Sequence, residues 1–149
     1  MNRDVVHRIL IAAEMLLLAL PASAICVFFS LALLSTVGFP WDFEALLIMH
    51  FVLLGNLGIV GLWRSAIAYL WHRGAGLGAL LWWWRAACLG AGLACVSLLL
   101  SELLVAGWQA PEIVAIVATG SLASPLLVPF LHLACLRRGA YRHNAAGPA

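Results

Sequence analysis

Ionisable side chains inside long apolar runs are the residues of this sequence with the greatest capacity for chemistry. A charge near the centre of a bilayer is costly unless it is paired or hydrated, so such residues mark ion pairs, proton relays or substrate contacts. Glu14, Arg64 and Arg85 lie at similar depth on three different apolar runs. We expect them to form an inner polar cluster, either a structural ion pair with arginines extended to the surface or an inward-facing polar vestibule.

A second group of ionisable residues lies near the opposite ends of the runs. Glu44, His50 and Glu102 are at one level there, and Asp42 and Glu112 are closer to water. Carboxylates and a histidine that meet at one level are able to relay protons. We call these five residues the outer polar cluster, and they carry the transport alternative considered below.

Small and weakly polar residues in the second and fourth runs indicate helix packing. Asn56 is flanked by Gly55 and Gly58 near the middle of its run, and we expect it to donate a hydrogen bond to another helix, with a substrate contact as the alternative. Ser121 and Ser124 lie beside prolines in the fourth run, where a broken helix could expose carbonyls to a cavity.

In the third run, Cys88 and Cys95 recur at a spacing of seven residues, which places them on one face of a helix together with Gly92. This face, which Glu102 joins at the same spacing, is small and weakly polar, so we expect it to pack inward, with Gly90 and Gly92 permitting close approach of a neighbouring helix. The cysteines show no C-x-x-C spacing, so neither a zinc site nor a disulfide oxidoreductase is indicated.

Five histidines in a small helical protein also require a test for haem or metal. His50 and His132 lie near opposite boundaries, so they cannot ligate one haem iron. His7 and His72 could approach His132 at the inner surface, which leaves a cytoplasmic metal site as a minor alternative. We expect interfacial histidines, no cofactor and no metal.

The elements that position these residues must be membrane helices. Of the 149 residues, 65% are hydrophobic and 9% are charged, with a mean hydropathy of +1.07. A soluble domain of this size is closer to half apolar and one quarter charged. Short segments that contain glycine or proline separate four apolar runs, each long enough to cross a bilayer. We predict a single all-α domain over residues 1–149, with spans at about 9–37, 43–71, 79–106 and 112–136 and a tail at 137–149.

Charge distribution predicts how these spans are oriented. The short loops predict an antiparallel four-helix bundle, in which both termini and the middle loop share one side. All eight basic residues belong to that side, so the positive-inside rule predicts that both termini are cytoplasmic. They are Arg3, Arg8, Arg64, Arg73, Arg85, Arg137, Arg138 and Arg142.

The first span resembles a secretory signal because small residues near Ala24 imitate a cleavage site. Glu14 interrupts the apolar stretch, however, and the hydrophobic run continues to Val37. We therefore expect an uncleaved first span with a kink at Pro21.

No nucleotide-binding, metalloprotease or nucleophile-elbow motif occurs in the sequence, so we expect no enzyme. The few arginines form no stripe, which argues against nucleic-acid binding. The expected partners are the lipid bilayer and another membrane protein or a second copy of the chain. We expect a non-enzymatic protein of a bacterial inner membrane that acts by helix–helix interaction.

In size and span number, the chain resembles the immunity proteins that protect bacteria from membrane-inserting toxins, and equally the accessory subunits of larger membrane assemblies. The resemblance is one of architecture. The alternative function is a small transporter or a proton or ion channel that uses Glu44, His50, Asn56 and Glu102.

Overall fold

Helices account for nearly all of the chain that the structure describes. The computed structural model describes the backbone of residues 3–36, 43–79, 81–105 and 111–145, and this part contains no strand. Its elements are α1 (Arg3–Glu14), the π-helical segment η1 (Met15–Ala19), α2 (Leu20–Thr36), α3 (Phe43–Ala79), α4 (Leu81–Val105), α5 (Pro111–Leu122), the 3-10 segment η2 (Ser124–Leu126) and α6 (Leu127–Ala145).

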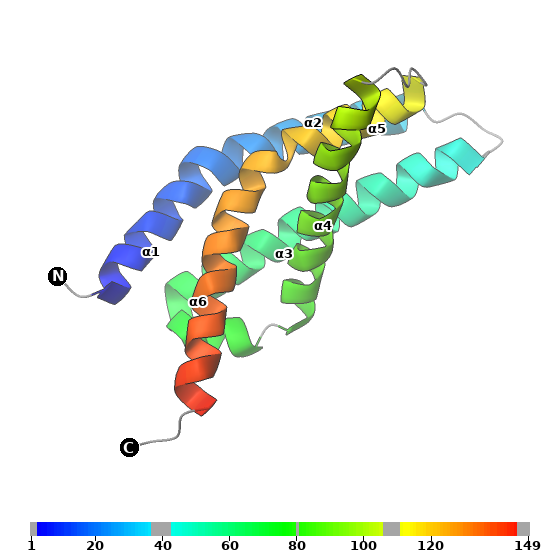
Figure 1. Cartoon of the computed structure of the whole chain (residues 1–149). Coiled ribbons are helices and arrows are strands. Elements are labelled where there is room, and N and C mark those ends of the chain that lie inside the picture. The colour runs from blue at the N-terminus through cyan, green and yellow to red at the C-terminus, as the bar shows by residue number, and fades with distance from the viewer. Residues whose placement is uncertain (1–2, 37–42, 80, 106–110, 146–149) are drawn as a thin grey trace.

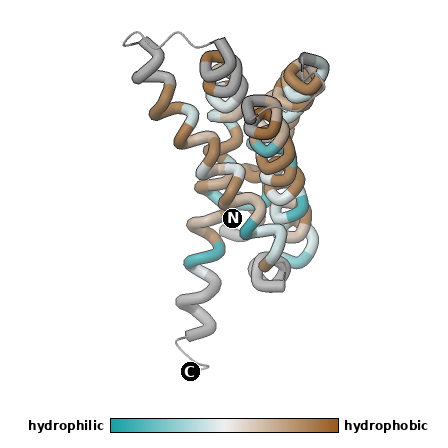
Figure 2. The backbone as a smooth tube through the Cα atoms, turned by 90° about the vertical axis from the view of Figure 1, so that its right-hand side faces the viewer, coloured by the Kyte–Doolittle hydropathy of each residue, from teal (hydrophilic) through white to brown (hydrophobic). Residues whose placement is uncertain are grey.

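Four of the described helices are long and apolar enough to cross a membrane, as the composition predicts. These segments are Val5–Ser35, Ile48–His72, Leu81–Leu100 and Gly120–Gly139. Each of them lies on one of the four apolar runs. Figure 2 shows hydrophobic residues along the described helices, with hydrophilic residues at only a few positions. The chain is therefore an all-helical protein with the features of a multi-pass membrane protein.

The first span is irregular where proline prevents regular helix bonding. Pro21 has no N–H to donate, and its ring crowds the carbonyl one turn earlier. The chain responds with η1, at whose end the N–H of Leu20 donates to the carbonyl of Met15, five residues before it. The irregularity expected at Pro21 thus takes the form of a π-helical turn, a feature that is frequent at functional sites.

Proline also divides the fourth span. α5 ends at Leu122, and the N–H of Ala123 donates to the carbonyl of Gly120 at 3.1 Å. The N–H of Leu126 then donates to the carbonyl of Ala123 at 2.9 Å, so the chain passes through one tight turn around Pro125 before α6 begins. η1 and η2 contact each other, so the two irregular segments lie at one place in the fold.

Figure 1 shows α1, η1 and α2 as one continuous rod, with α5, η2 and α6 beside it. α3 and α4 contact each other most extensively, and α4 also packs on α5. The start of α1, the end of α6 and the junction of α3 with α4 lie at one end of the molecule (Figure 1). The buried core consists of Ile11, Met15, Ala19, Ala22, Leu62, Ala66, Tyr69, Ala87, Leu126 and Leu133.

Small residues allow the backbones of α3 and α4 to meet. A Cβ atom added to Gly58 would overlap the Cα of Gly90, and one added to Gly61 would lie 2.6 Å from the carbonyl oxygen of Trp83. A Cβ atom on Gly120 of α5 would overlap the buried side chain of Ser97 on α4. Membrane helices associate by such close packing because lipid is as apolar as their side chains.

Two side-chain hydrogen bonds join α2 to α3. Trp63 Nε1 donates to Ser23 Oγ at 3.0 Å, and Asn56 Nδ2 donates to Ser30 Oγ at 2.9 Å. The two donors are seven residues apart, and so are the two acceptors. The earlier donor bonds the later acceptor, as expected for helices that run in opposite directions. The two bonds therefore repeat one contact after two helical turns.

Candidate functional site between α1 and α6

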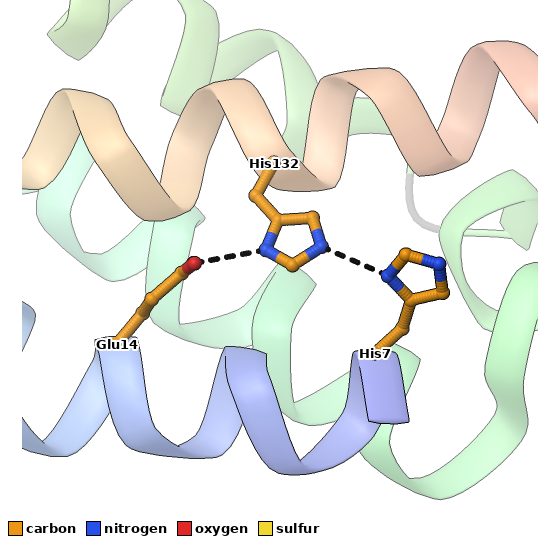
Figure 3. Close-up of polar contacts among 3 residues, drawn as sticks. All are labelled: His7, Glu14 and His132. Atoms are coloured by element: carbon orange, nitrogen blue, oxygen red, sulfur yellow. Dashed lines mark hydrogen bonds and ion pairs between the residues drawn. The ribbon is translucent and has the colours of Figure 1, made fainter. Parts of the chain in front are cut away.

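Three ionisable side chains form a line of polar contacts between α1 and α6, which we call the Glu14–His132–His7 line (Figure 3). His132 Nδ1 lies 3.0 Å from Glu14 Oε1 and 3.1 Å from Oε2. On the other side of the same ring, His132 Nε2 lies 3.3 Å from His7 Nδ1. A single histidine of α6 thus contacts two side chains of α1.

Helix periodicity explains how α1 presents both contacts. His7 and Glu14 are seven residues apart, which is about two turns or 10 Å along one face of a helix. His132 projects from α6 into the interval between them (Figure 3). Only 14% of the His132 side chain and 15% of the Glu14 side chain are exposed, so the contact is largely removed from solvent.

The line can hold a proton at more than one position. When Glu14 is ionised and His132 is neutral, Nδ1–H of His132 donates to the carboxylate and Nε2 accepts from His7. When His132 is protonated, both of its N–H groups donate, and His7 Nδ1 becomes the acceptor. The His7 and His132 rings meet edge-on, with centroids 5.5 Å apart and planes at 68°. The arrangement supports proton binding, a helix-to-helix lock or ligation of a cation.

The expected inner polar cluster is arranged differently. Glu14 pairs with His132 and contacts no arginine among the described side chains. Arg64 is exposed and lies over the Trp83 ring, 5.3 Å from its centroid, and Arg85 is exposed on α4. Similar depth in the membrane does not bring these residues together, because each helix turns its residue toward a different side.

Two other arginines at this end of the molecule are held by the protein. Arg8 donates from Nη2 to the carbonyl of Leu70 on α3 at 2.6 Å. Arg137 is buried over the Trp84 ring at 4.6 Å, and Trp84 in turn stacks on Phe130. A hydrogen bond thus holds the guanidinium group of Arg8, and a cation–π contact holds that of Arg137.

Most of the outer polar cluster cannot be placed. Asp42 lies outside the described residues, and so do the side chains of Glu44, Glu102 and Glu112. His50 is exposed, and its Nδ1 lies 2.7 Å from the carbonyl of Leu46 one turn earlier in the same helix. The outer polar cluster therefore stays a prediction.

Only some of the residues expected to pack helices contact another helix. Asn56 contacts another helix, as its hydrogen bond to Ser30 shows, and Gly58 lies at the α3–α4 crossing. Gly55 and Gly92 are not in close contact with another described helix, because a Cβ atom on either would meet no described atom within 4 Å. Ser121 is half-buried, and its Oγ has no partner among the described residues. Ser124 is half-buried at the start of η2.

A cavity of about 60 Å³ lies between the helices near Asn56. Asn56 lines this cavity, and its Nδ2 also donates to the carbonyl of Val52 at 2.8 Å. Glycine and alanine form much of the remaining wall, and Ser30 and Cys26 are among its few weakly polar members.

The approach of His7 to His132 was among the alternatives drawn from the sequence, whereas the contact of His132 with Glu14 was not. One signal was present, since the seven-residue spacing places His7 and Glu14 on one face of α1. The prolines of the fourth run indicated a possible break, which η2 provides, but the direction that it gives α6 could not be derived from spacing.

The comparisons with known proteins give no family: no family model, no curated protein and no solved structure matches the chain.

Proposed function

We propose that this chain is a non-enzymatic protein of a bacterial inner membrane that acts by helix–helix interaction with another membrane protein. In this proposal the four spans form an antiparallel bundle with both termini in the cytoplasm. The confinement of all eight arginines to the predicted inner side supports this orientation. An immunity protein against a membrane-inserting toxin and an accessory subunit are the two forms that such a function takes.

The observation that carries the proposal is a small-residue face of α4 that no described part of the chain covers. Cys88, Gly92 and Cys95 are all exposed, and nothing described lies within 4 Å of a Cβ atom at Gly92. Our expectation of inward packing is therefore wrong for Cys88, Gly92 and Cys95, whereas a Cβ atom at Gly90, the other glycine expected to permit close approach, would meet the backbone of Gly58. The inward-packing face of α4 is a different one, which contains Ala87 and Gly90.

Small residues on a membrane helix permit close backbone approach, which large aliphatic side chains prevent. α4 uses one small-residue face for α3 and presents a second one outward. A helix of another membrane protein fits this second face, because close packing there supplies the van der Waals contact that drives association in a bilayer.

A photo-activatable amino acid at Gly92 tests the proposal in native membranes. We expect a protein adduct at Gly92, identified by mass spectrometry, because this position lies on the uncovered face. Leu53 of α3 is the matched control, since it is equally helical and 60% exposed but lies off that face. We also expect Gly92→Leu to reduce co-purification of the identified protein by about tenfold, which corresponds to about 1.4 kcal/mol.

Two results would contradict the proposal. One is the same set of adducts from Gly92 and Leu53, and the other is co-purification that Gly92→Leu leaves unchanged. Protection of cells from a toxin that is itself the captured protein would identify an immunity protein, whereas a stoichiometric complex with a resident enzyme or transporter would identify a subunit.

The Glu14–His132–His7 line favours a second candidate, a proton or ion pathway. The line is polar, largely buried and continuous over two turns of α1. The line does not continue toward Asn56, because a buried apolar core lies between them. This core contains Met15, which follows Glu14, together with Leu62 and Leu126, which line the cavity near Asn56. This apolar layer places the pathway second to helix–helix interaction.

Proton flux into liposomes separates the two candidates. We expect flux equal to that of protein-free liposomes, because the apolar core interrupts the polar residues. Flux that is present in the natural chain and lost in Glu14→Gln would reverse the ranking. His72→Gln is the control, since His72 is an exposed histidine that neither form of the transport hypothesis uses.

A further inference from the structure

We infer that His7 and His132 form a binding site for a divalent cation of the zinc class, with Glu14 as the carboxylate that orients His132. The site is independent of the proposed helix–helix interaction. It departs from our expectation of a protein without metal and takes up, for His7 and His132, the minor metal alternative that the sequence left open. Three observations carry it: the separation of the two ring nitrogens, the hydrogen bond on the far side of His132, and the position of the pair near the start of the first span.

The separation of the nitrogens matches that of two ligands on one metal ion. His7 Nδ1 and His132 Nε2 are 3.3 Å apart. Two nitrogens bound at about 2.0–2.1 Å to a tetrahedral zinc ion are separated by about 3.3–3.4 Å. The same distance is at the long end for a direct hydrogen bond between nitrogens. A cation could therefore bind both His7 Nδ1 and His132 Nε2, at a point to one side of the line that joins them, with little movement of either helix.

The contact with Glu14 prepares His132 for ligation. A carboxylate can only accept a hydrogen bond, so His132 Nδ1 carries the N–H in this contact. In the neutral ring, Nε2 then carries the lone pair that can bind a metal. Histidine ligands in metal sites commonly donate their second N–H to a carboxylate in this way, which fixes the tautomer and raises the basicity of the ligand. Glu14 thus acts through His132 and is a positioning residue.

The protein supplies only part of the coordination shell. Among the described residues, no three histidine, cysteine, aspartate or glutamate side chains gather around one point. Two imidazoles leave the remaining positions of a tetrahedral ion to water, as in metal sites that keep exchangeable positions. His7 is half-buried and lies close to the start of α1.

Calorimetric titration with zinc chloride tests the site on the full chain, purified in detergent through a tag without histidine. We expect one Zn²⁺ per chain, loss of binding in His7→Ala, and affinity about 10- to 100-fold weaker in Glu14→Gln. His72→Ala and Cys135→Ser are the matched controls, because both residues are exposed and either could bind zinc adventitiously.

His7→Ala decides the test because it leaves the Glu14–His132 pair intact and the protein folded, which circular dichroism checks. The absence of stoichiometric binding would overturn the inference, as would binding that persists in His7→Ala. Binding lost only in Cys135→Ser or His72→Ala would assign zinc to a different site and would also overturn it. None of these outcomes depends on whether Gly92 captures a partner.

Discussion

Replacement of His132 by alanine is expected to lower the free energy of unfolding by about 3 kcal/mol, because it leaves the Glu14 carboxylate without its partner in a largely buried position. The loss includes two contacts, since His132 joins both Glu14 and His7 to α6. Unfolding in detergent micelles with increasing denaturant, followed by circular dichroism, measures this change.

A double substitution distinguishes the cost of the unpaired Glu14 carboxylate from the cost of lost side-chain packing. Glu14→Leu combined with His132→Leu is expected to return most of the lost stability, since replacing a buried ion pair by apolar residues is often neutral or stabilising. Glu14→Leu alone is expected to destabilise less than His132→Ala, because a neutral histidine is less costly to bury than a carboxylate. If His132→Ala unfolds at the same denaturant concentration as the natural chain, the contact contributes nothing to stability.

The other large effect is expected at the α3–α4 crossing. Gly58→Ala should destabilise the protein by about 1–3 kcal/mol, because the new methyl group meets the backbone of Gly90, which cannot rotate away. The same measurement of unfolding applies. Gly61→Ala should act in the same direction, since its Cβ atom would meet the backbone of Trp83 and Ala87.

Gly55→Ala is the matched control, since it lies one turn from Gly58 and has open space around it. Alanine is the better helix former by up to about 1 kcal/mol, so Gly55→Ala should leave stability unchanged or raise it. Equal destabilisation by Gly55→Ala and Gly58→Ala would mean that the glycines matter for the helix itself and not for the crossing.

The spans could be predicted from the sequence because membrane helices follow from length and hydropathy alone. The irregularity near Pro21 also followed from the residue, since proline lacks the N–H that a regular helix needs. Its form, a π-helical turn that begins after Glu14, did not, because several local arrangements satisfy the same missing bond.

The candidate site was harder to predict because sequence spacing gives depth but not the direction in which each helix faces its neighbours. Glu14 and Arg64 are expected at similar depth, yet Glu14 faces α6 and Arg64 lies over Trp83. α4 illustrates the same problem: Cys88 and Gly90 are two residues apart, and only the face of Gly90 packs on α3. Which of two small faces is buried depends on the partner helix.

The π-helical turn also sets the angle between two interfaces of the first span. Glu14 precedes η1 and faces α6, whereas Ser23 follows it and accepts from Trp63 of α3. A regular helix advances by about 100° per residue, so the surplus residue of the wider turn offsets these two directions by a comparable rotation. Loss of one residue between Met15 and Ala19 would restore regular winding, and the rod could then satisfy its histidine contact or its tryptophan contact, but not both.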